Sequence, residues 1–128
     1  MEELFRNEEH KFRFFTMMKD LGFEDFNDVY WRSLCFIISG DDRLFSMRSV
    51  LINFKSRSIN SEQWFSGQFS GGEQRLLGLG YNLFTNQDFY EYENDEKYFL
   101  SPLDIFSGLD IEGYQLAKNA LDMRLNRY

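Results

Sequence analysis

A helix-start signal placed directly before a leucine-rich run constrains this chain more than any other feature. In FSGGEQRLLGLGYNLF, residues 69–84, Ser70 and Glu73 stand three residues apart. This is the spacing of a capping box, in which each side chain accepts a hydrogen bond from the other residue's backbone N–H. The spacing predicts a helix over about 72–85 that Asn86 ends, lined by Leu76, Leu77, Leu79, Leu83 and Phe84.

The same letters resemble the signature segment of ABC-type ATPases. That segment works beside a phosphate-binding loop, and the chain contains no G-x-x-x-x-G-K-[ST] pattern and is about half as long as such a domain requires. We therefore interpret Ser70 as a helix cap and not as a nucleotide ligand. Gly78 and Gly80 are poor helix residues, and we expect them to let a neighbouring helix approach closely.

Helical spacing recurs along the rest of the chain. Phe14, Met17, Met18 and Leu21 fall on one face of the first segment. The apolar run at 34–38 could also be a buried strand, but the spacing upstream of it favours a helix. We predict helices over 7–21, 28–39, 42–54, 72–85, 101–107 and 111–126, with at most a short turn at 61–66.

Capping residues mark the starts of these helices. The proposed N-caps are Asn7, Asn27, Asp41 or Asp42, Ser101 and Asp110. Pro102 suits the first position of its helix. In the last helix, one apolar face is expected to carry Tyr114, Ala117, Leu121 and Leu125.

No clean alternation of polar and apolar residues and no two-residue hairpin signal occurs, and the only proline is Pro102. Apolar residues make up 43% of the chain, enough for one core. We predict an all-α fold, a compact irregular bundle of six or seven short helices. Residues 1–128 would form a single helical domain, with an acidic loop at about 86–100.

Charge and cysteine content constrain partners and compartment. The net charge of −7 makes general attraction to nucleic acid unfavourable and favours a protein partner with a basic surface. The single cysteine, Cys35, allows no internal disulfide and suits a reducing cytoplasm. The acidic N-terminal segment does not resemble a signal peptide, and no apolar run is long enough to cross a membrane. We expect a cytoplasmic protein without membrane contact.

Catalytic and metal chemistry find little support in the sequence. The single histidine, His10, and the single cysteine are far apart, and no metal-ligand spacing occurs. Cys35 lies within an apolar run and is predicted to be a buried core residue. Paired carboxylates fall at predicted helix starts or in loops. We therefore expect no catalytic residue, no metal and no cofactor.

A weak basic patch lies at 43–57, formed by Arg43, Arg48, Lys55 and Arg57 and followed by Trp64. Basic residues beside an aromatic can bind single strands. Acidic residues lie close by, so a solvated helix face is the favoured interpretation, and direct nucleic-acid binding is disfavoured.

The segment 88–96 is the candidate binding surface. It contains five acids in nine residues, interleaved with three aromatics. One interpretation is a partner-binding surface with Tyr90 or Tyr92 as an aromatic anchor; the other is a disordered, solvated insertion. The candidate binding residues are Asp88, Tyr90, Glu91, Tyr92, Glu93, Asp95 and Glu96.

Several pieces together resemble a known family. HKFRFFTMMKD, LCFIISGDDRLF, QRLLGLGYNLF and SPLDIFSGLD, followed by a C-terminal helix, are similar to a domain-of-unknown-function family of small helical proteins from Gram-positive bacteria and their phages. The resemblance spans His10 to Arg124. It implies a compact helical protein, often encoded in mobile elements, and no activity. Ser70-Gly71-Gly72 stands where the family pattern has small hydroxyl residues, and 88–97 resembles an insertion.

These observations favour a non-enzymatic protein-binding module. A sharper form is a phage or mobile-element inhibitor of a host system, for example an anti-CRISPR protein whose acidic surface mimics nucleic acid. A small structural or regulatory domain that forms homodimers is the alternative. An unrecognised enzyme is the least favoured hypothesis.

Overall fold

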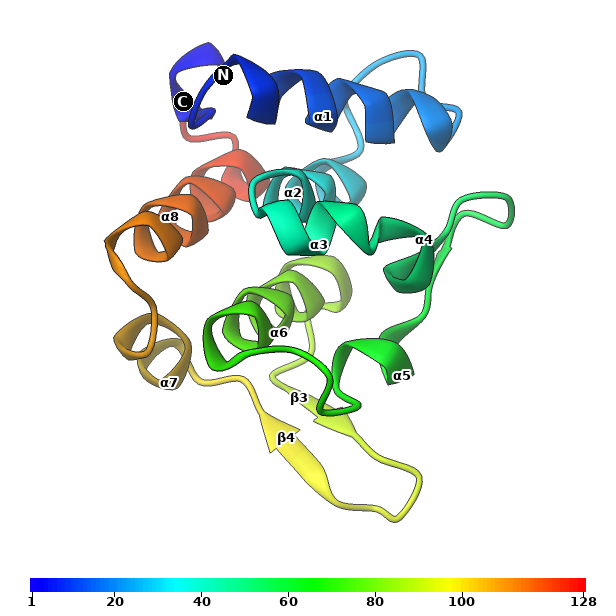
Figure 1. The fold of residues 1–128 in the computed structure, drawn as a ribbon, viewed down its shortest axis with the longest axis vertical. Coiled ribbons are helices and arrows are strands. Elements are labelled where there is room, and N and C mark those ends of the chain that lie inside the picture. The colour runs from blue at the N-terminus through cyan, green and yellow to red at the C-terminus, as the bar shows by residue number, and fades with distance from the viewer.

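The structure is a computed structural model of residues 1–128 and contains eight α-helices, one 3₁₀ turn and two short antiparallel hairpins (Figure 1). The all-α prediction is confirmed, with more and shorter helices than expected. In chain order the elements are η1 (Glu2–Leu4), α1 (Glu8–Asp20), α2 (Val29–Ser39), α3 (Asp42–Ser46), α4 (Arg48–Leu51), β1 (Ile52–Asn53), β2 (Ser58–Ile59), α5 (Ser61–Trp64), α6 (Gly71–Thr85), β3 (Phe89–Glu91), β4 (Lys97–Phe99), α7 (Pro102–Ser107) and α8 (Ile111–Leu125).

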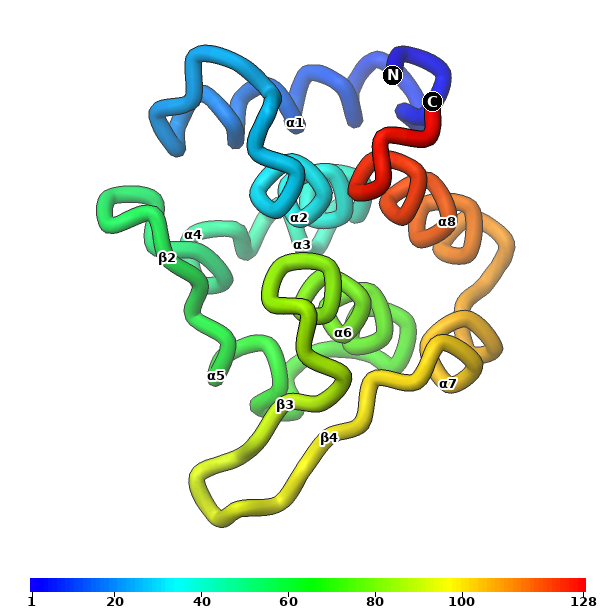
Figure 2. Tube along the Cα trace, turned by 180° about the vertical axis from the view of Figure 1, so that it is seen from behind, coloured from blue at the N-terminus to red at the C-terminus, as the bar shows by residue number.

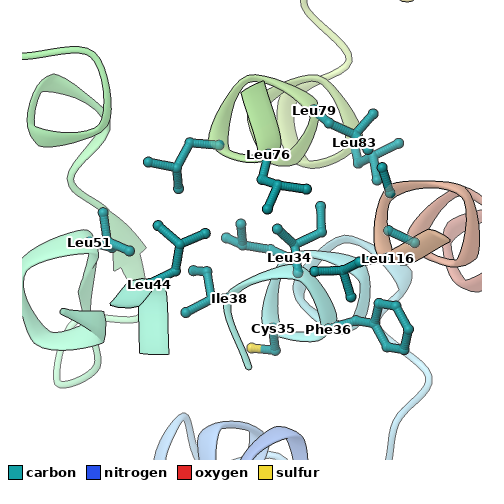
Figure 3. Packing of buried hydrophobic residues seen from close by; sticks show 14 of the residues in the cluster. Leu34, Cys35, Phe36, Ile38, Leu44, Leu51, Leu76, Leu79, Leu83 and Leu116 are labelled. Atoms are coloured by element: carbon teal, nitrogen blue, oxygen red, sulfur yellow. The ribbon is translucent and has the colours of Figure 1, made fainter. Parts of the chain in front are cut away.

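Helix α2 is the centre of the fold, with α1, α6 and α8 packed around it (Figures 1 and 2). Every residue from Trp31 to Ser39 is buried. A helix that is covered on all sides carries apolar residues all round. This explains why a buried strand was the alternative interpretation of the apolar run at 34–38. In Figure 3, Leu34 of α2 lies between Leu76 of α6 and Leu116 of α8.

Most predicted caps form. The Ser70 hydroxyl accepts a bond from the Glu73 N–H at 3.3 Å, and the Glu73 carboxylate accepts one from the Ser70 N–H at 2.9 Å. Asn7, Ser101 and Asp110 also cap their helices, and Asp41 caps α3. The cap of α2 is Asp28 and not Asn27: its carboxylate accepts bonds from the N–H groups of Tyr30 and Trp31.

The single helix predicted over 42–54 is wrong. The chain turns out of α3 at Met47, forms the four-residue α4, and enters the β1–β2 hairpin, where Ile52 pairs with Ile59. The indole N–H of Trp64 donates to the Leu51 carbonyl at 2.9 Å. This long-range bond takes a carbonyl that a continued helix would have used, so tertiary contacts override the local spacing.

The buried face of α8 also differs from the predicted one. Tyr114 and Leu125 are exposed, whereas Leu116, Ala117, Ala120 and Met123 are buried. Two alanines on the buried face let α8 lie close to α2. The predicted face is therefore confirmed for Ala117, which is fully buried, and for Leu121, which is partly buried against the core, and it is wrong for Tyr114 and Leu125.

Arginines from distant segments reach the C-terminal ends of four helices. Arg6 donates to the Gly40 carbonyl after α2, Arg57 to Leu21 after α1, Arg32 to Met123 in α8, and Arg124 to Leu83 in α6. A helix C-terminus carries partial negative charge and free carbonyls, so cations stabilise it. Much of the basic charge is thus used inside the fold. No helix is both long and apolar enough to span a bilayer.

Candidate functional site

The acidic segment forms a hairpin that projects from the end of the molecule opposite α1 (Figures 1 and 2). The prediction of an acidic loop at 86–100 is therefore wrong for six residues, which form two paired strands. Phe89 pairs with Phe99, Tyr90 with Tyr98, and Glu91 with Lys97. Aromatic residues occupy both faces of these three-residue strands. As a result, the segment lacks the polar–apolar alternation that reveals a strand in a sequence.

One face of the hairpin packs on the loop that follows α5. The ring of Tyr90 stacks on buried Phe65, with centroids 4.5 Å apart and planes at 23°. The Tyr92 hydroxyl donates to the Phe65 carbonyl at 3.0 Å. Tyr98 lies on the same face, 5.3 Å from the Phe65 ring. These contacts fix the hairpin against the helical body.

Between the hairpin and α5 lies an open groove of about 630 Å³, which we call the aromatic groove. Three of the seven predicted binding residues line it: Tyr90, Tyr92 and Glu93. The other four predicted residues, Asp88, Glu91, Asp95 and Glu96, are exposed but lie outside it. The complete lining is Glu62, Phe65, Ser66, Tyr90, Tyr92, Glu93 and Asn94.

Sequence reasoning missed four of the seven lining residues: Glu62, Phe65, Ser66 and Asn94. The first three precede the hairpin by more than twenty residues and belong to a segment that was interpreted only as a short turn. The adjacent aromatic residues Trp64 and Phe65 were the available signal, because two large apolar side chains in a short turn indicate packing against another part of the fold.

Negative charge around the aromatic groove is not neutralised within the chain. No carboxylate at 86–100 forms an ion pair, and neither does Glu62. Lys97 is the only basic residue of that stretch, and its ammonium lies over the Phe89 ring at 4.7 Å. The groove therefore combines aromatic walls with free anionic groups.

The phenols of the groove stay protonated at neutral pH. Burial, and then the charges of Glu62 and Glu93 among its neighbours, raise the pKa of Tyr90. Burial also raises the pKa of Tyr92. The Tyr92 hydroxyl is committed to Phe65, whereas the Tyr90 hydroxyl makes no hydrogen bond within the protein.

A second, entirely polar cleft of about 460 Å³ lies where α1 meets the starts of α3, α6 and α8. Its arginines already have partners: Arg6 pairs with Glu112 at 2.8 Å, Arg13 with Asp42 at 2.7 Å, and Arg43 with Glu73 at 3.7 Å. The charged groups of this cleft pair with one another, whereas Glu62 and Glu93 of the aromatic groove have no ion-pair partner.

His10 borders the polar cleft but is only 3% exposed. Its Nδ1 accepts a bond from the Arg6 N–H at 3.1 Å, so the proton is on Nε2, which donates to the Phe36 carbonyl at 2.9 Å. Burial lowers the pKa of His10 to about 4, against the opposing effect of the Phe36 bond. Both nitrogens of the neutral ring are thus engaged in holding the fold together.

Cys35 and two arginines of the basic patch have structural roles. Cys35 is fully buried, as predicted, and burial raises the pKa of its thiol. In the basic patch, Arg57 stacks on Phe23 at 4.4 Å, and Arg48 lies over Phe45 at 4.0 Å while donating to the Phe45 carbonyl. These guanidinium groups are used inside the fold.

Comparison with known families identifies the family of the chain but gives no activity. The model of a family described as a family of unknown function (DUF6075) matches residues 1–128. The chain belongs to DUF6075. This agrees with the resemblance to a domain of unknown function carried by the segments quoted above. No curated protein and no solved structure matches the chain. For this member of DUF6075, function is therefore argued from the aromatic groove.

Proposed function

We propose that this protein is a non-enzymatic protein-binding module and that its aromatic groove holds a basic segment of a partner protein. The observation that carries the proposal is the pairing of Tyr90 and Tyr92 with two carboxylates, Glu62 and Glu93, that have no ion-pair partner.

The physical argument rests on complementarity. Tyrosines bury large apolar rings while keeping a polar hydroxyl, which is why they are enriched at protein interfaces. Unpaired carboxylates attract lysine and arginine and raise the association rate. The net charge of −7 adds a long-range attraction for basic partners.

The unpaired acids of the hairpin also support the sharper form of this proposal. A partner surface that ordinarily binds nucleic acid is basic. The hairpin segment 88–96 contains five acidic residues, and the hairpin projects from one end of the molecule (Figure 1). In this form the protein is an inhibitor of a host nucleic-acid-binding system. Such an inhibitor competes with nucleic acid for its partner, which a displacement assay measures once the partner is known.

A second candidate, homodimerisation, rests on a different observation. Most aromatic side chains pack inside the protein. Several large apolar side chains are nevertheless exposed, including these four: Phe99 (66%), Leu103 (78%), Ile111 (87%) and Tyr114 (48%). They lie along β4, α7 and the start of α8. A contiguous exposed apolar patch marks a contact surface, so this candidate requires the four side chains to form one patch. Sedimentation equilibrium at rising protein concentration distinguishes this candidate, since only a dimer doubles the mass.

The proposed function is tested with a fluorescent nine-residue peptide rich in lysine and arginine. Its affinity is measured by anisotropy for the parent and for Glu62→Gln/Glu93→Gln. The matched control, Asp20→Asn/Glu24→Gln, removes the same charge from exposed positions that have no ion pair.

We expect the groove variant to bind about tenfold more weakly and the control to change by less than about twofold, because each contact between exposed charges contributes at most about 1 kcal/mol. Equal loss in both variants, or no binding by the parent, contradicts the proposal.

A further inference from the structure

The walls of the aromatic groove are flat and lie in different planes. The rings of Tyr90 and Tyr92 are 5.2 Å apart and meet at 87°. Phe65, which also lines the groove, stacks on Tyr90 and holds this ring in place. A flat group entering the groove therefore meets preorganised ring surfaces, and little side-chain freedom is lost on binding.

The two carboxylates reach the groove from separate elements. Glu62 belongs to α5, and Glu93 lies in the turn between β3 and β4. Both charges act on the Tyr90 hydroxyl, since each contributes, after burial, to the raised pKa of that group. Both side chains are exposed and free of ion pairs, so they are available to a cation beside Tyr90.

Arginine and lysine side chains interact differently with a groove that has aromatic walls and carboxylates at its edge. A guanidinium is planar, weakly hydrated and able to stack on a ring while its five N–H groups bond acceptors at its edges. An ammonium is compact and strongly hydrated, and it offers no flat face. The fold itself shows the first combination: Arg57 stacks on Phe23 while its Nε donates to the Leu21 carbonyl.

From this arrangement we infer that the aromatic groove recognises an arginine side chain of the partner. The guanidinium lies against the tyrosine rings and bonds to the carboxylates of Glu62 and Glu93, and the unpartnered Tyr90 hydroxyl supplies a further polar contact. This inference rests on the proposed function and narrows it from a basic segment to a specific residue type.

Three peptides of one design test the inference: a Gly/Ser nonapeptide with three arginines, the same peptide with three lysines, and the same with three citrullines. Citrulline keeps the planar shape but lacks the charge. We expect the arginine peptide to bind about fivefold or more tightly than the lysine peptide, because stacking and bidentate bonding are lost with lysine. The citrulline peptide is expected to lose at least about tenfold, as two carboxylates remain unpaired.

Variants of Tyr90 and of the two glutamates separate the possible outcomes. Tyr90→Leu is expected to reduce the preference for arginine over lysine to about twofold or less, whereas Tyr90→Phe, which keeps a ring, retains most of it. Equal binding of lysine and arginine that still depends on Glu62 and Glu93 overturns the arginine inference and leaves the proposed function standing. Binding of no basic peptide, or binding indifferent to Glu62→Gln/Glu93→Gln, overturns both.

Discussion

Tyr90 stacks on Phe65 with ring centroids 4.5 Å apart, and this contact joins the acidic hairpin to the loop after α5. The neighbouring Tyr92 hydroxyl strengthens the junction by donating to the Phe65 carbonyl. A segment that resembles a solvated loop by composition is held in place by aromatic contacts. Its acidic residues therefore border a surface of defined shape.

The two groove tyrosines should respond differently to removal of their hydroxyls. Tyr92→Phe loses the bond to Phe65 and should lower the free energy of unfolding by about 1 kcal/mol. Tyr90→Phe serves as the control and should change it by less than about 0.5 kcal/mol, because its hydroxyl has no partner to lose. Urea unfolding followed by tryptophan fluorescence measures both. Equal effects would show that the Tyr92 bond does not hold the hairpin.

The capping box at the start of α6 should contribute measurably to stability. Ser70→Ala removes the acceptor for the Glu73 N–H and should cost about 1 kcal/mol of unfolding free energy. A double-mutant cycle with Glu73→Ala should show coupling, because the two bonds share one turn. Added ATP should not change the melting temperature of the parent. A thermal shift with ATP that disappears in Ser70→Ala would restore the nucleotide-binding interpretation.

Two glycines of α6 offer a matched test of helix packing. A Cβ on Gly80 would lie 3.1 Å from Leu34 Cδ1 of α2, a fully buried side chain, whereas a Cβ on Gly72 would meet nothing within 4 Å. Gly72→Ala should stabilise by up to about 1 kcal/mol through helix propensity. Gly80→Ala has the same gain but overpacks the core at a cost of about 1–3 kcal/mol, so it should destabilise. Thermal unfolding compares them; stabilisation by both changes would argue against close packing at Gly80.

His10 should make stability fall as the solution is acidified. Its pKa is about 4 in the folded protein and has an ordinary value of 6.5. Between these values the unfolded chain binds a proton that the folded protein does not, so stability is full above pH 6.5 and declines as pH falls towards 4. The loss from this group is about 3 kcal/mol.

The control for this effect is His10→Gln, which cannot titrate in that range. Denaturant unfolding from pH 7 to pH 4 should show the stability difference between parent and variant shrinking as pH falls. A constant difference over this range would mean that His10 titrates alike in the folded and unfolded chain.

Local signals predicted much of this fold because helix caps depend on residues three apart in the sequence. Ser70 with Glu73, Ser101 with Asp104, and Asp110 with Gly113 need no knowledge of distant residues. The prediction that Gly80 lets a neighbouring helix approach closely is also confirmed, since that glycine lies against α2. Gly78 differs: a Cβ there would lie 3.2 Å from Leu100 Cδ2, in the segment after β4 and not in a helix.

The features that sequence reasoning missed depend on long-range contacts. The end of α4 coincides with the bond from Trp64 to Leu51, and the buried face of α8 includes two small residues, Ala117 and Ala120. Four of the seven residues that line the aromatic groove were likewise not predicted. Tyr90, Tyr92 and Glu93 stood out by composition, but Glu62 joins them only because Phe65 packs against the hairpin.

The most direct measurement for the groove is a ¹H–¹⁵N NMR titration of the isotope-labelled protein with the three-arginine peptide. The largest saturable shifts should fall within 62–66 and 90–94, the two segments that supply the lining of the groove. Those shifts should be much smaller in Glu62→Gln/Glu93→Gln at the same subsaturating peptide concentration, because this variant is expected to bind about tenfold more weakly. Shifts confined to the polar cleft around 6–13 or to the basic patch at 43–57, or no shifts at all, would contradict a binding role for the aromatic groove.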